Sequence, residues 1–171
     1  MNPLNEYSTE DGVSPKIELR ESPINGLGMF AKSPITSGET VVVWGGTFVE
    51  TEEAERARAQ GKIVLQLDDD VYSIEEPGED STYFMNHSCD PNVWMDDRVT
   101  LVSRRAIATD EELTVDYSLF EANQDVFMGW QCVCGSPQCR KRITGQDWRL
   151  LELQARYAGH FLPLIAKRIS G

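Results

Sequence analysis

The spacing of the cysteines constrains the fold of this chain more than any other feature of its sequence. The chain has four cysteines, and Cys89 lies alone, far upstream of the others. The other three fall within eight positions of one another: Cys132, Cys134 and Cys139. Structural zinc takes four ligands in a tetrahedron, so the triplet needs one more. Cys89 is the only remaining thiol, although the chemistry also permits His87 or His160. If Cys89 completes the cage, two distant segments must meet.

The composition indicates one globular domain. The chain has 171 residues, of which 40% are hydrophobic and 26% are charged, enough to bury a substantial core. No apolar run reaches the length of a membrane span, and the polar start at residues 1–15 lacks the apolar stretch of a secretory signal. We therefore expect an intracellular protein, cytoplasmic or nuclear, without a membrane partner. In a reducing compartment, clustered cysteines favour metal binding over disulfides.

The charge of the chain bears on its partners. There are 28 acidic and 16 basic residues, which gives a net charge of −12. Direct binding to nucleic-acid phosphates rests on Lys and Arg, so we expect no direct nucleic-acid partner. An acidic surface suits a basic, Lys-containing protein, such as a histone-like or ribosomal chain. The charge alone is equally compatible with a role in solubility, and the sequence does not predict an oligomeric state.

The hydrophobic pattern predicts a mainly β protein of the β-rich α+β class, with helices at its C-terminal end. Runs bounded by turn residues indicate short strands at 40–44, 63–67, 71–74, 93–95, 99–103 and 113–115. The second and third of these strands flank three aspartates and are expected to form a hairpin. Thr51 is expected to cap a helix over 52–60. Helical spacing predicts a helix from Asp147 to Gly159, and Pro163 is expected to begin a final helical turn.

Two further motifs carry little information when each is taken alone. Gly26-Leu27-Gly28 lacks the third glycine and the following helix of a dinucleotide site, so a turn is the simpler interpretation. Asn25-Gly26 is itself a tight-turn signal between two extended segments. Tyr117 follows a predicted strand, where its hydroxyl could orient a reacting group or belong to a core aromatic residue.

Taken together and in order, these motifs resemble the SET-domain protein lysine methyltransferases with a post-SET zinc motif. The resemblance covers residues 17–143. It includes the G-x-G-(M/V)-F-A opening at 26–31, N-H-S-C-x-P-N at 86–92, E-E-L-x-x-D-Y at 111–117 and C-x-C-G-x3-C-R at 132–140. Each motif is modestly specific, whereas the ordered set is highly specific.

The resemblance implies a SET-domain fold of small sheets with a pseudoknot, in which one segment threads beneath another. It assigns residues 15–125 to the SET domain and 126–144 to the post-SET zinc-binding segment. Residues 1–14, which have few apolar anchors, are expected to be a flexible N-terminal arm. Residues 145–171 lie beyond the family core and are expected to form a C-terminal helical extension.

The resemblance also implies an activity, which is transfer of a methyl group from S-adenosyl-L-methionine to the ε-amine of a protein lysine. Tyr117 would be the catalytic residue. Cofactor-binding residues would be Gly26, Leu27, Gly28, Tyr83, Asn86 and His87. The substrate channel would contain Trp44, Met95 and Val115. A structural zinc ion would be held by Cys89, Cys132, Cys134 and Cys139. The lysine must first lose a proton, which at pH 7 costs about 4–5 kcal/mol.

Three positions depart from the family pattern. Tyr83 stands where Arg is common, Trp44 replaces a usual tyrosine, and Val115 stands where Phe or Tyr often sets the number of methyl groups added. Loss of a hydroxyl at Val115 is expected to favour di- or trimethylation. Two other functions stay open: a catalytically silent SET module that binds a basic peptide or partner, and a zinc-stabilised interaction domain.

Overall fold

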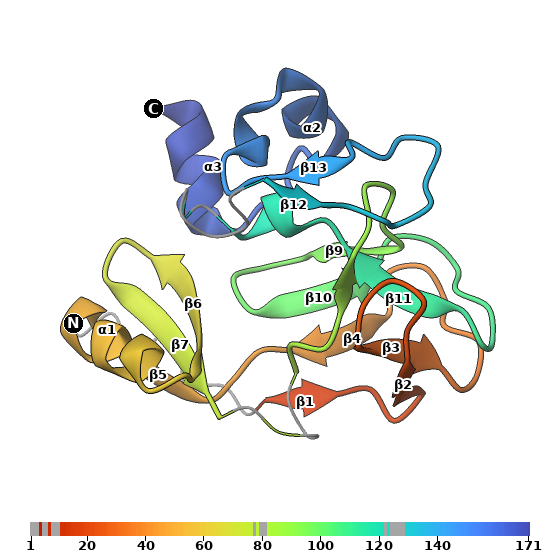
Figure 1. The fold of residues 1–171 in the computed structure, drawn as a ribbon, viewed down its shortest axis with the longest axis horizontal. Helices are drawn as coiled ribbons and strands as arrows, with labels where there is room; N and C mark the ends of the chain where they lie inside the picture. The colour runs from red at the N-terminus through yellow and green to blue at the C-terminus, as the bar shows by residue number, and fades with distance from the viewer. Residues whose placement is uncertain are drawn as a thin grey trace.

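The computed structural model describes residues 4, 7, 11–76, 78, 82–121, 123 and 129–171. Strands outnumber helices in this part of the chain, and the expected β-rich architecture of small sheets is confirmed (Figure 1). The strands are β1 Gly12–Val13, β2 Ile17–Glu21, β3 Leu27–Ala31, β4 Thr40–Val43, β5 Thr47–Val49, β6 Ile63–Asp68, β7 Val71–Glu75, β8 Asn86–His87, β9 Val93–Met95, β10 Thr100–Ser103, β11 Glu112–Val115, β12 Trp130–Gln131 and β13 Arg142–Ile143.

The main sheet has the strand order β1-β4-β10-β9-β11-β3-β2, and β8 also pairs with β11. Strand β11 pairs with three other strands: it runs antiparallel to β3 and parallel to both β8 and β9. These parallel pairings bring the segment that carries Asn86 and His87 against the segment that ends in Tyr117. The buried β-branched and aliphatic residues of β4, β10 and β11 form the centre of the core.

The predicted turn at Asn25-Gly26 connects β2 to β3, which pair in antiparallel register from Ile17↔Ala31 to Glu21↔Leu27. Gly26 has φ +47°, a left-handed conformation that glycine adopts without steric cost. The backbone N–H of Ser22 donates to the Gly26 carbonyl over 2.8 Å and closes the turn. The turn therefore sets the position at which the G-x-G segment enters the sheet.

A smaller sheet of order β5-β7-β6 packs with helix α1 (Thr51–Ala59) in a separate part of the fold (Figure 1). The predicted hairpin is confirmed as β6 and β7. The predicted cap is wrong: Thr51 is the first helical residue, and Glu50 occupies the N-cap position without a side-chain hydrogen bond. Instead, the Thr51 backbone N–H and hydroxyl both donate to the Asp70 carboxylate at the hairpin tip. The Asp70 carboxylate thereby accepts a backbone N–H at the start of α1 that the N-cap residue Glu50 does not bind.

Two described parts of the N-terminal segment are ordered in the fold, which differs from the expected flexible arm. Gly12 and Val13 form β1 and pair with Val43 and Val42 of β4. Tyr7 is only 2% exposed, and its ring lies 5.7 Å from that of Phe48. The burial of a single aromatic residue in an otherwise polar segment is a tertiary effect that composition does not reveal.

The single predicted helix from Asp147 is two elements in the structure, η3 (Asp147–Arg149) and α2 (Leu151–Arg156). Leu150 has ψ 119°, an extended conformation that interrupts the helix. The apolar spacing was misleading, because Leu151 is 79% exposed whereas the nearby Leu153 is buried. Helix α3 (Pro163–Ser170) begins at Pro163 as predicted.

The C-terminal extension packs on the rest of the fold: α2 lies above β13 in Figure 1, and α3 contacts β6 of the smaller sheet. The His160 ring stacks on Trp94 of β9 with centroids 3.5 Å apart, and its Nδ1 donates to the Met95 carbonyl over 2.8 Å. The Leu162 backbone N–H donates to the Leu119 carbonyl over 2.8 Å. His160 is thus engaged at β9. Within the described residues, none of the helices is both long enough and apolar enough to span a bilayer.

Candidate active site and cysteine cluster

The four cysteines form one cluster, although about forty residues separate Cys89 from the others in sequence. One possible ligand atom from each lies within 4.8 Å of all the others: Cys89, Cys132, Cys134 and Cys139. Cys89 and Cys132 are buried, and Ile143 packs against the group. Four thiols in mutual reach match the ligand set of a structural zinc site. The predicted fourth thiol is therefore Cys89, and His160 is not a member of the cluster.

Backbone donors around the cluster also suit bound thiolates. The N–H of Cys89 is 3.5 Å from the Cys134 sulfur, and the N–H of Arg140 is 3.3 Å from the Cys89 sulfur. Hydrogen bonds from N–H groups stabilise negative charge on sulfur, which is the form that ligates a metal. Both the ligand number and the surroundings of the sulfurs fit zinc.

Asn86 lies beside the G-x-G segment, with the orientation of its side-chain amide fixed by three acceptors. Its Nδ2 donates to the carbonyl oxygens of Asn25 and Leu27, each over 3.1 Å, and to Glu112 Oε1 over 2.8 Å. Because all three neighbours accept, the nitrogen must face them and the oxygen must face away. Among the described residues, no hydrogen bond to Asn86 Oδ1 is present, so this oxygen remains an acceptor for a ligand.

Glu112 explains why residue 28 is glycine. A Cβ atom on Gly28 would lie 2.3 Å from Glu112 Oε1 and 3.0 Å from Asn86 Nδ2. The Ser22 hydroxyl holds the same carboxylate at 2.8 and 3.0 Å. The space that a side chain would need is thus filled by a carboxylate tied to Asn86.

His87 is 1% exposed and contacts the catalytic candidate directly. Its Nδ1 accepts the backbone N–H of Tyr117 over 3.2 Å, and its Nε2 lies 3.3 Å from the Cys89 sulfur. Burial lowers the pKa of His87 to about 4, so the ring is neutral at pH 7. The neutral ring with its proton on Nε2 satisfies both contacts, and this tautomer links the cysteine cluster to the backbone of Tyr117.

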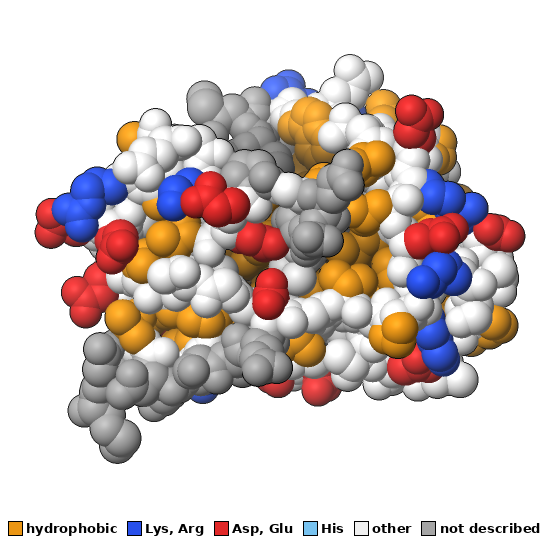
Figure 2. All heavy atoms as spheres, turned by 90° about the horizontal axis from the view of Figure 1, so that it is seen from below, with side chains coloured by type: hydrophobic (Ala, Val, Ile, Leu, Met, Phe, Trp, Pro, Cys, Tyr) orange, Lys and Arg blue, Asp and Glu red, His pale blue; other side chains and the backbone are white. Residues whose placement is uncertain are grey.

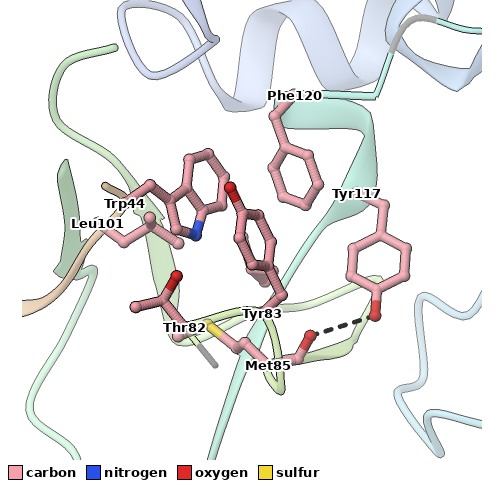
Figure 3. A pocket seen from close by; sticks show the side chains of 8 residues that line it. Trp44, Thr82, Tyr83, Met85, Leu101, Tyr117 and Phe120 are labelled. Carbon is pink, nitrogen blue, oxygen red and sulfur yellow. Dashed lines mark hydrogen bonds between the residues drawn. The ribbon is translucent and has the colours of Figure 1, made fainter. Parts of the chain in front are cut away.

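A pocket of about 150 Å³ opens beside Tyr117. Its lining combines four aromatic with four smaller side chains: Trp44, Tyr83, Tyr117, Phe120, Thr82, Met85, Leu101 and Val115. Figure 3 shows the Tyr83 ring between Trp44 and Tyr117. Trp44 stacks on Tyr83 with centroids 5.6 Å apart and meets the edge of Phe120 at 5.1 Å. An apolar cavity of similar volume accommodates benzene, so the pocket has room for the end of an aliphatic amine, and its ring faces attract cations.

Tyr117 is the polar end of this pocket. Its hydroxyl donates to the Met85 carbonyl over 3.1 Å, as the dashed line in Figure 3 shows. Burial, together with the negative charge of Glu112, raises the pKa of Tyr117 to about 12. The side chain is therefore a neutral phenol at physiological pH, able to donate and accept hydrogen bonds but not to act as an anionic base.

The structure brings most of the predicted site residues together, with two differences in place. Trp44, Val115 and Tyr117 line the pocket. Tyr83, expected on the cofactor side, also lines it. Met95, expected in the channel, lies outside the lining and is 1% exposed in the core.

Sequence reasoning missed several residues of the site. Four residues line the pocket but lie outside the quoted motifs: Thr82, Met85, Leu101 and Phe120. Glu112 is inside a quoted motif, but its contact with Asn86 was not predicted. Alternation along the strand would have placed Glu112 and Thr114 on one face, yet nothing local indicates which partner that face meets.

A buried charged group joins the strand end to the cysteine segment. Arg140 makes a two-pronged contact with Asp116, Nη1 to Oδ2 over 2.7 Å and Nη2 to Oδ1 over 2.8 Å. Its Nε donates to Asp147 over 2.9 Å, and the Tyr157 hydroxyl donates to Asp116 over 3.1 Å. Burial disfavours the Asp116 charge, but the hydrogen bonds and charge of Arg140 outweigh it and hold the pKa of this carboxyl below its usual value.

The fold has a counterpart among solved structures. A humanized mutant of the Chaetomium thermophilum Polycomb Repressive Complex 2, bound to the inhibitor GSK126, matches 59% of this chain and 14% of its own with a TM-score of 0.51 at 23% identity. This likeness concerns the fold. The SET domain family model matches residues 26–118, and the chain therefore belongs to the SET domain family.

Curated relatives give the same result. The histone-lysine N-methyltransferase ash1 of Drosophila melanogaster is 32% identical over 88% of this chain, and an H3 lysine-4 specific histone-lysine N-methyltransferase of Mycosarcoma maydis is 29% identical over 74%. The alignments cover only 7% and 10% of those two relatives, respectively. The resemblance thus concerns one domain of much longer proteins.

Proposed function

We propose that this chain transfers methyl groups from S-adenosyl-L-methionine to the ε-amine of a lysine in a protein substrate. One observation carries the proposal: Tyr117 makes contacts on two sides. Its side chain lines the aromatic pocket, and its backbone N–H donates to His87 of the N-H-S-C segment. One residue therefore stands between a pocket suited to an aliphatic amine and the segment assigned to the cofactor. Methyl transfer needs this alignment of amine and donor more than it needs an acid or a base.

In this proposal the lysine ammonium gives its proton to solvent water, and the pocket residues bind the neutral amine. Trp44, Tyr83 and Phe120 exclude water, and a dry site disfavours the ammonium form of the amine. The neutral hydroxyl of Tyr117 accepts or donates a hydrogen bond at the mouth of the pocket and aligns the amine. Its attachment to the Met85 carbonyl fixes the direction of the hydroxyl oxygen.

The cofactor is assigned to the other side of Tyr117. S-adenosyl-L-methionine supplies an activated methyl group on a sulfonium when it is bound. Asn86 presents its Oδ1, which accepts no hydrogen bond from the described residues, to a donor such as the amino group of the cofactor, while the backbone of Gly26 and Leu27 lies alongside. Glu112 keeps the Asn86 amide in that orientation. Gly28 contributes by leaving room for Glu112, in addition to any backbone contact.

Zinc is assigned a structural role in the four-cysteine cluster. The cluster joins Cys89, just after β8, to the loop between β12 and β13. A metal bound there would hold the post-SET segment against His87 and Tyr117. Four thiolates would fill its coordination, so no position would remain for chemistry.

The substrate is proposed to be a basic, Lys-containing protein of the histone type. The names of both cited relatives describe action on histone lysine, and this chain carries a net charge of −12. In the face shown in Figure 2, acidic side chains lie among apolar ones near the middle, and most Lys and Arg side chains lie toward the edges. This distribution favours a positively charged peptide. Such a substrate favours action in the nucleus.

Radiolabelled methyl transfer tests the proposal. The chain should transfer label from S-adenosyl-L-methionine to core histones, and Tyr117→Phe should reduce the rate by about a hundredfold or more because alignment is lost. Tyr72→Phe on β7, outside the pocket lining, is the matched control and should retain the rate. A wild-type chain that labels neither histones nor proteins of a whole-cell extract would contradict the proposal.

A second function is favoured by one specific observation. The Tyr83 ring lies within the pocket between Trp44 and Tyr117, where it reduces the space for a lysine (Figure 3). A silent module would bind S-adenosylhomocysteine or a basic peptide but transfer no label. Calorimetric binding without turnover, in wild type and in Tyr83→Ala alike, would support that alternative over the enzyme.

We also propose that the product is di- or trimethyl-lysine. Val115 adds no hydroxyl to the pocket, the Tyr83 hydroxyl is 2.9 Å from Ser73 Oγ, and the Tyr117 hydroxyl donates to Met85. Without a hydroxyl at position 115, a water molecule in the path of further methyl groups loses one anchor. Mass spectrometry of a peptide after many turnovers tests this idea, and a reaction that stops at monomethyl-lysine would disprove it.

A further inference from the structure

Arg140 occupies an unusual place between the cysteine cluster and the turn that carries Tyr117. Its side chain is 10% exposed, and its three guanidinium nitrogens all donate to carboxylates, two to Asp116 and one to Asp147. The planar fork of arginine matches both oxygens of Asp116, which a lysine could not do. Asp116 is fully buried and depends on this partner for its charge.

The other contacts of Asp116 lead directly to Tyr117. Asp116 is the N-cap of the short helix η2 (Tyr117–Leu119), and its Oδ1 accepts the backbone N–H of Ser118 over 3.1 Å. Tyr117 is the first residue of that helix. The carboxylate therefore fixes the turn from which the Tyr117 ring projects, and a displacement of Asp116 would displace the ring.

The cysteine segment has two further contacts, one with Cys89 and one with the Tyr117 ring. The backbone N–H of Arg140, next to Cys139, donates to the Cys89 sulfur over 3.3 Å. The ring of Trp130 on β12 stacks on Tyr117 with centroids 6.3 Å apart and planes at 12°. The post-SET segment therefore contacts the Tyr117 ring through Trp130 and supports the Tyr117 backbone turn through Arg140 and Asp116.

The C-terminal extension completes the arrangement, although it lies outside the 26–118 match to the family model. Tyr157, the residue after α2, is fully buried and donates its hydroxyl to Asp116 Oδ2 over 3.1 Å. Asp147 of η3 accepts from Arg140 Nε. Two residues of the extension thus bind the two charged partners: Asp147 binds Arg140, and Tyr157 binds Asp116.

We propose that Arg140, Asp116 and Tyr157 are positioning residues, through which the cysteine cluster and the C-terminal extension hold Tyr117 in the geometry needed to bind cofactor and lysine. This inference rests on the proposed methyl transfer. It predicts that the extension supports the active site itself, beyond its effect on stability. Removal of Arg140 leaves a buried carboxylate without its cation, so Asp116 turns toward water and releases the backbone of the Tyr117 turn.

Four variants of the full chain test this inference: Arg140→Met, the double variant Arg140→Met/Asp116→Asn, Tyr157→Phe, and the control Arg149→Met. Arg149 is an exposed arginine of η3, and its guanidinium lies over the Trp148 ring. Each variant is measured for bound zinc per chain, for the Kd of S-adenosylhomocysteine by calorimetry, and for kcat and KM with a histone peptide.

We expect Arg140→Met to keep its zinc, to raise the Kd about tenfold or more and to lower kcat even at saturating cofactor. Tyr157→Phe, which removes one hydroxyl and leaves the cluster intact, should raise the Kd about threefold. The double variant should recover most of the affinity, because a neutral amide in place of the Asp116 carboxylate needs no cation and still caps the turn. A lower kcat at saturating cofactor in a variant that keeps its zinc is the result that a purely structural role of the arginine would not give. Arg149→Met should match the wild type in all measurements.

Three results would overturn the inference: an unchanged Kd and kcat in Arg140→Met, unchanged values in Tyr157→Phe, or a double variant weaker than Arg140→Met alone. Should Arg140→Met lose its zinc, Tyr157→Phe decides, since it alters no residue near a sulfur. A wild-type chain that fails to bind S-adenosylhomocysteine would instead refute the proposed function, and the inference with it.

Discussion

Replacement of Gly28 by alanine tests the tie between the G-x-G segment and Asn86. The new Cβ would lie 2.3 Å from Glu112 Oε1, well inside an ordinary van der Waals contact, and 3.0 Å from Asn86 Nδ2. The carboxylate must therefore swing away. That movement breaks its hydrogen bonds to Asn86 and Ser22, which are 2.8 Å long at their shortest. Backbone strain is not involved, because no positive φ occurs at Gly28.

The magnitude follows from the bonds that are lost. A hydrogen bond to a charged group contributes about 1.5–3 kcal/mol, and Glu112 is partly exposed, so we expect Gly28→Ala to lower the free energy of unfolding by about 2–4 kcal/mol. Urea denaturation measures this change. The affinity for S-adenosylhomocysteine should fall as well, since the released amide of Asn86 no longer presents its oxygen.

Two comparisons make the result interpretable. Gly12→Ala on β1 places its Cβ in open space and should change stability by less than about 0.5 kcal/mol. In a Glu112→Ala background, Gly28→Ala should cost much less than in the wild type, because the obstructing carboxylate is gone. Equal costs in the two backgrounds, or a cost for Gly28→Ala no larger than for Gly12→Ala, would refute the reasoning.

Three further predictions concern pH and metal. The rate constant for methyl transfer should rise between pH 7 and pH 10, because the lysine substrate loses its proton over this range. Ionisation of Tyr117 should not reduce the rate there, since the pKa of Tyr117 is raised to about 12. A stopped-assay pH profile that declines above pH 8 in a stable enzyme would contradict this prediction. Hydrogen bonds from Lys16 and Thr36 lower the pKa of Glu39 to about 2. The Glu39 carboxylate therefore stabilises the fold above about pH 4.5, and this contribution is lost as pH falls through 2. Thermal melts should show that Glu39→Gln destabilises the chain at pH 7 and has little effect at pH 2. Cys132→Ser should abolish zinc binding in elemental analysis and lower the Tm by more than about 10 °C, and an unchanged Tm would contradict a metal site.

The parts of the fold and site that sequence predicted well are those with a chemical or periodic signature. Thiols have few roles inside the cell, so four of them implied one cluster, and Cys89 was the only thiol available to complete it. The hairpin of β6 and β7 has two β-branched runs around a turn, and its register follows locally. Family motifs added the aromatic pocket around Trp44 and Tyr117, which periodicity alone would have classed as core.

The parts that sequence missed depend on side-chain partners that the hydrophobic pattern does not reveal. Leu150 adopts an extended conformation within apolar helical spacing, since Asp147 accepts from Arg140 and Thr144 instead of capping a longer helix. Thr51 has an ordinary cap signature, yet Asp70 of the hairpin tip occupies its donors. Neither segment carries a local trace of these pairings, because the competing conformations are close in free energy and tertiary contact decides between them.

The buried contact of Tyr157 with Asp116 has a consequence for the timing of synthesis. A ribosome produces the chain from the N-terminus, so the G-x-G segment, the N-H-S-C segment and Tyr117 all leave the exit tunnel before the residues that hold them. Until residue 157 has emerged, Asp116 lacks the hydroxyl that completes its hydrogen bonding. A nascent or truncated chain would therefore carry every motif of the active site before the Tyr117 turn is held in place. Under the proposed function, activity would begin only when the final helices pack.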